Sequence, residues 1–293
     1  MKLHNVPTAD LRRILRATER DAGPDSTEAR ASFGGMLLDK GNDDEAIRQL
    51  NAVVVKDNSI LDIAWGPSFI VATWVALAVN LARSPAGTSF GARQYLVAAL
   101  VTIWGLRLGI RIFRRNRGRG EDPRYVKFRE QWGKWFTLRS YFQLFLFQAL
   151  ILMLNVTPVL LIVAGARSSL AWSDWLGLAV WVVGFLFESV GDYQLDSFLK
   201  VPENRGTIID QGLWRYTRHP NYFGEATMWW GIFVIALNQP WGWVGVIGPV
   251  VITGMLLFVS GVPMTERMME KTPGWEEYKR TTSMFIPWFK RAG

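Results

Sequence analysis

The sequence of 293 residues contains no cysteine and only two histidines. A disulfide framework, a cysteine metal ligand and a cysteine nucleophile are therefore excluded, and we assign no metal site. The sequence also lacks a glycine motif of the GxGxxG type and a Walker loop. Any nucleotide must then be held by something other than a Rossmann or P-loop domain.

Charged side chains are missing from two long stretches. Residues 226–265 contain none over 40 residues, and residues 141–166 contain none over a further 26. One crossing of a bilayer takes about 20 predominantly apolar residues. These runs exclude a soluble globular domain and a disordered chain, and they predict a multispanning membrane protein.

Six apolar stretches are long enough to be membrane helices, which predicts an all-α transmembrane helix bundle. Asn238, Gln239 and Pro240 form a turn signal that separates the last two stretches. Pro158 is expected to kink the third, because proline removes a helix donor and crowds the preceding turn. The six predicted spans are residues 59–82, 94–113, 141–165, 174–191, 221–238 and 242–262.

The N-terminal part differs from the rest. Residues 1–58 contain nine basic and ten acidic residues, without a stretch long enough to cross a membrane and without the apolar core of a secretory signal. We expect a polar cytosolic appendage over residues 1–58 and a transmembrane domain over residues 59–293.

The distribution of basic residues predicts the orientation. Residues 111–139 contain ten Lys or Arg against three acidic residues. Because basic loops stay in the cytosol, six spans place both termini there, in a bacterial inner membrane or the endoplasmic reticulum. This topology explains most of the net charge of +8. The basic face could also bind anionic membrane lipids or a phosphorylated cofactor, whereas nothing resembles a nucleic-acid-binding module.

Ionisable side chains at or within the predicted spans are informative, because a charge near the bilayer centre costs at least about 2.5 kcal/mol. Asp62 either caps a helix start at the interface or has a function, and Arg107 either reaches the interface, pairs with a carboxylate or contacts a ligand. Glu188 and Asp192 are four residues apart and share one helix face. That face suits binding of polar ligand groups or pairing with basic loop residues.

The densest group of polar residues is the sequence TRHPNYFGE, where a basic loop meets the fifth predicted span. Pro220 suits the first position of a helix. The free amides of that helix start, beside Arg218 and His219, would attract phosphate. Asn221 and Glu225 are four apart and offer an amide and a carboxylate on one face.

A second basic sequence, RRNRGRGEDPRY, occupies residues 114–125. Arginine binds phosphate through two parallel hydrogen bonds, and glycine lets a backbone approach closely. The positive-inside rule would also explain such a loop.

Three segments resemble the DUF1295 family, the bacterial-type relatives of steroid 5-alpha-reductases, over about residues 59–290. They are GLWRYTRHPNYFGEATMWWG, WGLRLGIRIFRRNRGRGEDPRY and EEYKRTTSMFIPWF. RHPNY followed by Gly and an acid also occurs in sterol reductases, and the shorter RHPxY in isoprenylcysteine carboxyl methyltransferases. The resemblance implies a bundle of six to seven membrane helices that holds NADPH in a cavity open to the cytosol.

The resemblance also implies roles for single residues. Asp62 is the best match to the acid of the family's catalytic acid–tyrosine pair, whereas the place of the tyrosine falls on Trp104 or Gly105. Together with Arg218 and His219, the residues expected to bind the cofactor are Asn116, Arg119, Asp192, Tyr193, Asn221, Glu225 and Arg267.

We therefore expect a membrane-embedded, NADPH-dependent reductase of a C=C bond in a lipophilic enone or sterol-like substrate, with Asp62 stabilising the developing enolate. One alternative is a methyltransferase that uses S-adenosylmethionine, for which an arginine loop is superfluous. Another is a non-catalytic membrane protein that binds lipid.

Overall fold

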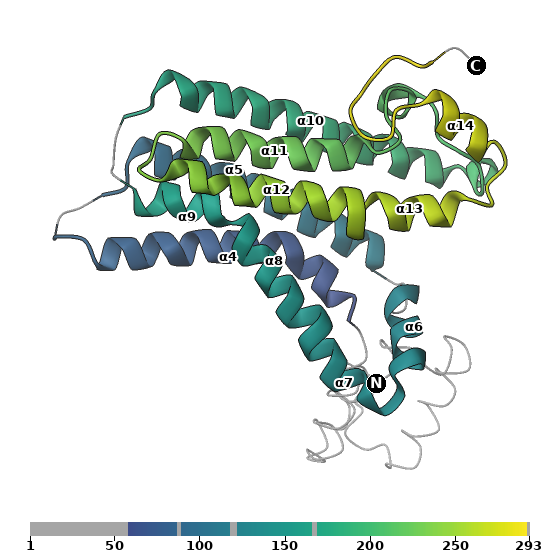
Figure 1. The fold of residues 1–293 in the computed structure, drawn as a ribbon, viewed down its shortest axis with the longest axis horizontal. Helices are drawn as coiled ribbons and strands as arrows, with labels where there is room; N and C mark the ends of the chain where they lie inside the picture. Colours follow the sequence, from purple (N-terminus) through teal and green to yellow (C-terminus); the bar gives the residue numbers. More distant parts are fainter. Residues whose placement is uncertain (1–57, 87–88, 118–121, 166–168, 292–293) are drawn as a thin grey trace, which may run out of the picture. The chain divides into compact units, whose positions relative to one another are not determined.

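The computed structural model describes residues 58–86, 89–117, 122–165 and 169–291. Arg119 and residues 1–57 of the predicted appendage lie outside these ranges. The described residues are helical and contain no strand, only an isolated bridge between Thr217 and Ser283. The α-helices are α4 (Ile60–Ala82), α5 (Ala92–Asn116), α6 (Pro123–Trp132), α7 (Phe136–Arg139), α8 (Phe147–Asn155), α9 (Thr157–Ala164), α10 (Trp172–Lys200), α11 (Pro220–Ala236), α12 (Ile247–Gly254), α13 (Val262–Met269) and α14 (Trp275–Thr281) (Figure 1).

Shorter helical turns connect several of these helices. Two of them, η3 (Ser140–Leu146) and η7 (Met255–Val259), are π-helical. The others are 3-10 turns, namely η2 (Gly133–Trp135), η4 (Pro202–Asn204), η5 (Gly212–Arg215) and η6 (Gly242–Val246).

Five described helical stretches are long and apolar enough to cross a membrane, so the chain is an integral membrane protein: Ile60–Ala82, Ala92–Asn116, Arg124–Asn155, Trp172–Lys200 and Gly242–Met269. The predicted span 221–238 corresponds to α11, which has 17 residues and is not one of the five. The turn at residues 237–241 ends α11 as predicted. The break at Pro158 is also confirmed, because α8 ends at Asn155 and α9 begins at Thr157.

The helices belong to two compact units, whose boundaries fall inside α4, α5 and α8. The described part of the first comprises residues 58–67 and Gly105–Gln148. The second comprises Ser68–Trp104 and Ala149–Gly293.

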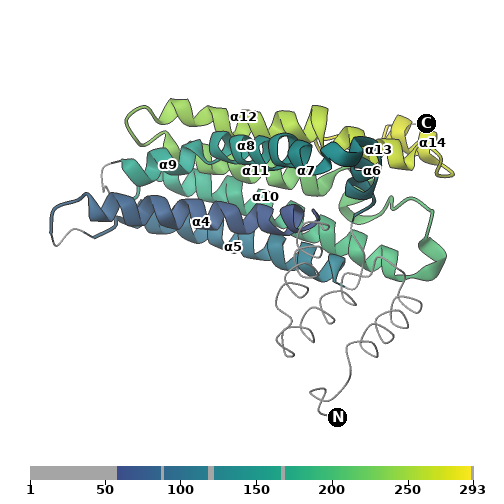
Figure 2. The same cartoon turned by 90° about the horizontal axis from the view of Figure 1, so that it is seen from below.

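Helix α11 is the centre of the second unit. It packs against α9, α10 and α12, and both views place it between α10 and α12 (Figures 1 and 2). Glycines let α10 and α11 approach closely, as is usual between membrane helices. A Cβ atom on Gly184 would lie 2.6 Å from the Gly224 carbonyl oxygen, and one on Gly177 2.6 Å from that of Gly231. Because Gly177 faces Gly231 and Gly184 faces Gly224, the two helices are antiparallel.

A buried ion pair joins α5 to the beginning of α10 in this unit. Arg93 Nε donates to Asp174 Oδ1 at 2.8 Å, and both side chains are almost completely buried. Asp174 Oδ2 also accepts from the Ala171 amide, and its Oδ1 accepts from Asn238 Nδ2 at 3.1 Å. The carboxylate is thereby paired and hydrogen-bonded, as a buried charge requires.

In the first unit, part of the predicted basic loop is helical. Pro123 stands at the start of α6, and the Asp122 side chain accepts a hydrogen bond from the Arg124 amide at 2.9 Å. This is the pattern of an N-cap followed by proline. The first part of the third predicted span, residues 141–155, correspondingly belongs to a longer helical stretch that runs from Arg124 to Asn155, and the rest of that span is α9.

Candidate functional site

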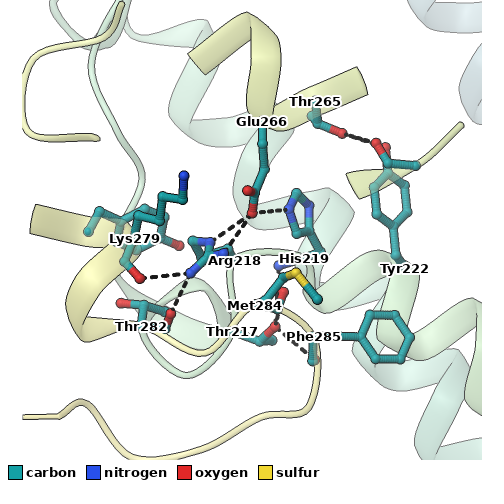
Figure 3. A network of polar contacts seen from close by, with 12 residues as sticks. Thr217, Arg218, His219, Tyr222, Thr265, Glu266, Lys279, Thr282, Met284 and Phe285 are labelled. Carbon is teal, nitrogen blue, oxygen red and sulfur yellow. Dashed lines mark hydrogen bonds and ion pairs between the residues drawn. The ribbon is translucent and has the colours of Figure 1, made fainter. Parts of the chain in front are cut away.

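In the second unit, polar contacts concentrate where the loop after η5 enters α11 (Figure 3). Pro220 is the first residue of α11, as predicted, and His219 occupies the N-cap position. Arg218 and His219 are buried, with exposed fractions of 7% and 4%. Both side chains contact Glu266 of α13: Arg218 Nε lies 2.9 Å and His219 Nε2 3.2 Å from its Oε1 atom.

The remaining donors of Arg218 point to the C-terminal part of the chain (Figure 3). Its Nη1 donates to the carbonyl oxygens of Lys279 at 2.9 Å and Thr282 at 2.7 Å. Burial lowers the pKa of His219, although the Glu266 carboxylate opposes this shift. The structure thus gives Arg218 and His219 partners within the protein, and phosphate binding by them remains a prediction.

Four residues predicted to bind a cofactor lie on α10 and α11. Asp192 is buried, and its Oδ1 accepts from Asn221 Nδ2 at 3.2 Å, so these two predicted residues are brought together. The other side-chain atom, Asn221 Oδ1, is buried and accepts no hydrogen bond from the described residues. Glu225, one turn further along α11, is partly buried. Tyr193 is exposed.

The exposed Tyr193 lines an open cavity of about 390 Å³ near the end of α10. Phe198 and Ile209 supply apolar walls, and Gln194 and Gln211 supply amide groups. The lining contains no charged side chain. Such a cavity suits an uncharged polar or aromatic group.

Glu188 lies on α10, one turn before Asp192, in a different environment. It is buried, and its Oε2 accepts from Trp104 Nε1 at 3.1 Å. Trp104 packs in turn against Phe69 and Trp229, with ring centroids 5.3 Å and 5.4 Å away. At Trp104, one of the two positions where the resemblance leads one to look for a tyrosine, a tryptophan therefore donates to a buried carboxylate.

The first unit contains a second cluster, around Asp62 in the first turn of α4. Tyr125 donates its hydroxyl hydrogen to Asp62 Oδ1 at 2.9 Å, and Arg124 Nη2 lies 2.5 Å from Asp62 Oδ2. Arg124 also contacts Asp122, through Nε at 2.9 Å. Burial would raise the pKa of Asp122, but its hydrogen bonds and ion pair with Arg124 outweigh burial and lower it.

Tyr125 is the residue that sequence reasoning missed. It belongs to the quoted RRNRGRGEDPRY segment but received no role, because its distance of 63 residues from Asp62 gives no local signal. The Asp-Pro pair before it could have predicted a helix start, which would have placed Tyr125 in a first turn.

The other predicted residues are not part of these clusters. Asn116 is the last residue of α5 and lies 3.4 Å from Arg115 Nε through its Oδ1 atom. Arg267 is exposed on α13, next to Glu266. Arg119 lies outside the described residues.

Comparisons with known proteins connect these features to a family. The family model described as "Protein of unknown function (DUF1295)" matches residues 50–282. An uncharacterized protein of Schizosaccharomyces pombe is 27% identical over 228 residues, which are 67% of this chain and 63% of that protein. The 3-oxo-5-alpha-steroid 4-dehydrogenase 1 of Mus musculus is 31% identical over 121 residues, 39% of this chain and 44% of the mouse protein. The chain thus spans less than two thirds of either relative, and no solved structure matches it.

Proposed function

The chain belongs to the DUF1295 family, and from this premise we propose that it is a membrane-embedded, NADPH-dependent reductase of a C=C bond in a lipophilic enone or sterol-like substrate. The partial similarity to a steroid dehydrogenase supports the reaction class. The five membrane-spanning stretches support a substrate that enters from the bilayer.

The observation that carries the proposal is the hydrogen bond between Tyr125 and Asp62. A reductase of enones needs a donor at the carbonyl oxygen, where negative charge develops when the β-carbon gains hydride. Asp62 accepts hydrogen bonds at both oxygens, from Tyr125 and Arg124. Because an ionised carboxylate can only accept, we assign the donor role to Tyr125 and make Asp62 its positioning residue.

The residues of the second unit fit a nucleotide cofactor. Asn221 Oδ1 is a buried acceptor without a donor among the described residues, and such an atom is costly unless a ligand or water pairs with it. We propose that Asn221, Asp192, Tyr193 and Glu225 contact the cofactor from this unit. Asn116, Arg119 and Arg267 remain the proposed partners of its phosphates. Arg218 and His219 also remain proposed phosphate contacts, in addition to their contacts with Glu266, which hold the loop.

These assignments give the cofactor and the side chains of the first unit different roles in the reaction. Bound NADPH would supply the hydride, which is chemistry that no side chain can perform. The phenol has one hydroxyl hydrogen, so Tyr125 would turn it from Asp62 to the substrate carbonyl when the substrate binds. Asp62, paired with Arg124, would hold the hydroxyl in place until then. Tyr125 is buried, which would limit the access of water to its hydroxyl group.

Calorimetric titration of the protein in lipid nanodiscs tests cofactor use. NADPH, NADH and S-adenosylmethionine are titrated in parallel, together with the Asn221→Ala and Arg119→Ala variants. We expect NADPH to bind more tightly than NADH, and both variants to weaken it, Arg119→Ala more for NADPH than for NADH.

The outcomes separate the alternatives. Binding of S-adenosylmethionine alone would overturn the proposal in favour of methyl transfer. Binding of none of the three compounds would leave a non-catalytic lipid-binding protein as the better account.

A further inference from the structure

The segment after α14 has apolar side chains that face away from the protein. From Ser283 to Trp288 the exposure alternates as in an extended strand. Met284, Ile286 and Trp288 are exposed, by 40%, 65% and 67%, and the residues between them are less exposed. Phe285 points inward and packs against Phe223 of α11, with ring centroids 5.8 Å apart.

The outward-facing row formed by Met284, Ile286 and Trp288 is held in place by hydrogen bonds on the inner side of the segment. The Ser283 carbonyl accepts from the Arg218 amide at 2.9 Å. The Phe285 carbonyl accepts from Thr217 Oγ1 at 2.8 Å (Figure 3). The Trp288 amide donates to the Tyr216 carbonyl at 2.9 Å. The exposed apolar row is therefore a fixed feature of the surface.

The composition of the segment indicates what covers the row. Leaving apolar surface in water costs about 25 cal/mol per Å². Two basic residues, Lys290 and Arg291, follow the row directly, and residues 282–291 contain no acidic residue. Phe289 is 76% exposed beside them. Aromatic and aliphatic side chains next to basic ones are typical of segments that lie in a membrane interface.

We propose that residues 284–291 are an interfacial anchor that binds anionic lipid. Met284, Ile286, Trp288 and Phe289 enter the boundary between headgroups and acyl chains. Arg291 and Lys290 face anionic headgroups. The Lys290 contact to Asp210, at 3.2 Å, is solvent-exposed and weak enough to be exchanged for a headgroup.

The anchor has a structural consequence for the loop before α11. Its backbone contacts Thr217 and Arg218, so lipid binding would hold this loop at the membrane surface. The inference rests on the exposed segment alone and does not depend on the reductase proposal.

The absence of cysteine makes the test direct. Ile286→Cys and, as a control, Glu276→Cys on the exposed surface of α14 are labelled with an environment-sensitive fluorophore. The proteins are reconstituted in vesicles of phosphatidylcholine with or without phosphatidylglycerol. We expect lipids with a quencher near the headgroup to quench position 286 strongly, and aqueous iodide to quench position 276 instead. The Lys290→Glu, Arg291→Glu double variant should reduce lipid quenching at 286 in the anionic vesicles.

Three results would overturn the anchor. Position 286 could be quenched by iodide as strongly as position 276, which would leave the row in water. It could be protected from both quenchers, which would mean that a protein surface covers the row. Equal lipid quenching in neutral and anionic vesicles would contradict the assignment of anionic headgroups.

Discussion

Tyr125 is the side chain on which the proposed chemistry depends most directly. The Tyr125→Phe substitution keeps the ring and removes the hydroxyl that Asp62 holds. We predict that turnover falls about 100-fold to 1000-fold, the usual effect of losing one donor at a developing oxyanion, while NADPH binding is unchanged. Tyr141→Phe, at an exposed tyrosine of the same unit, is the matched control. Turnover within a few-fold of wild type would remove Tyr125 from the mechanism.

Glu266 has a structural role as the counter-ion of the buried Arg218. In Glu266→Gln, the buried Arg218 guanidinium keeps its charge and loses its counter-ion. We predict a loss of about 2–3 kcal/mol in the free energy of unfolding, less than the roughly 3–5 kcal/mol for breaking a fully buried pair, because Glu266 is partly exposed. Glu277→Gln removes an exposed pair with Arg280 and should change stability by less than about 1 kcal/mol. Thermal unfolding in detergent measures both, and equal losses would contradict the role of Glu266.

The buried His219 should make the stability of the folded protein depend on pH. Because burial lowers its pKa in the folded protein, its contribution to stability is fully present above about pH 6.5 and is lost as the pH falls through the lowered value. Glu266 and Arg218 are the charged groups that face the ring. We predict that the unfolding temperature drops on acidification below pH 6.5, and that His219→Gln reduces this drop. His4→Gln, at the only other histidine, should leave the drop unchanged.

Among the elements, the contact between α10 and α11 determines how the second unit is built. A methyl group on Gly184 would meet the Gly224 carbonyl oxygen at 2.6 Å, whereas one on Gly254 in α12 would meet nothing within 4 Å. We predict that Gly184→Ala destabilises by about 1–3 kcal/mol. Gly254→Ala should be neutral or stabilising by up to about 1 kcal/mol, because alanine favours a helix. Similar thermal stabilities of the two variants would contradict the close approach.

The helices themselves could largely be predicted from sequence, because apolar runs, proline and turn residues act locally. Pro220, Pro158 and the turn at residues 238–240 ended or began helices where expected. The start at Asp122 was missed because positive charges suggested a loop, although the N-cap pattern was present. Side-chain pairs such as Tyr125 with Asp62, or Trp104 with Glu188, join distant residues, and no periodicity predicts them.

For the whole molecule, the topology depends on whether α11 crosses the membrane. Its 17 residues extend about 25 Å, slightly less than the hydrocarbon core of about 30 Å. The exposed Trp241 and Trp243 that follow it are typical of an interface, which favours crossing. We therefore propose six spans with both termini in the cytosol.

Cysteine labelling tests this topology. Ser169→Cys and Glu276→Cys are treated with an impermeant thiol reagent in sealed right-side-out vesicles. Three crossings separate the two positions if α11 spans the membrane, so only position 169 should react before permeabilisation. Identical labelling of both positions would mean that α11 does not cross.

The central claim is that this chain reduces a lipophilic enone with NADPH. The most direct measurement incubates the reconstituted protein with a panel of enones and NADPH deuterated at the transferable position, and follows the products by mass spectrometry. The account predicts a saturated ketone that carries one deuterium at its β-carbon, formed by wild type and strongly reduced in Tyr125→Phe. The absence of deuterium transfer to every enone, by protein that binds NADPH, would contradict it.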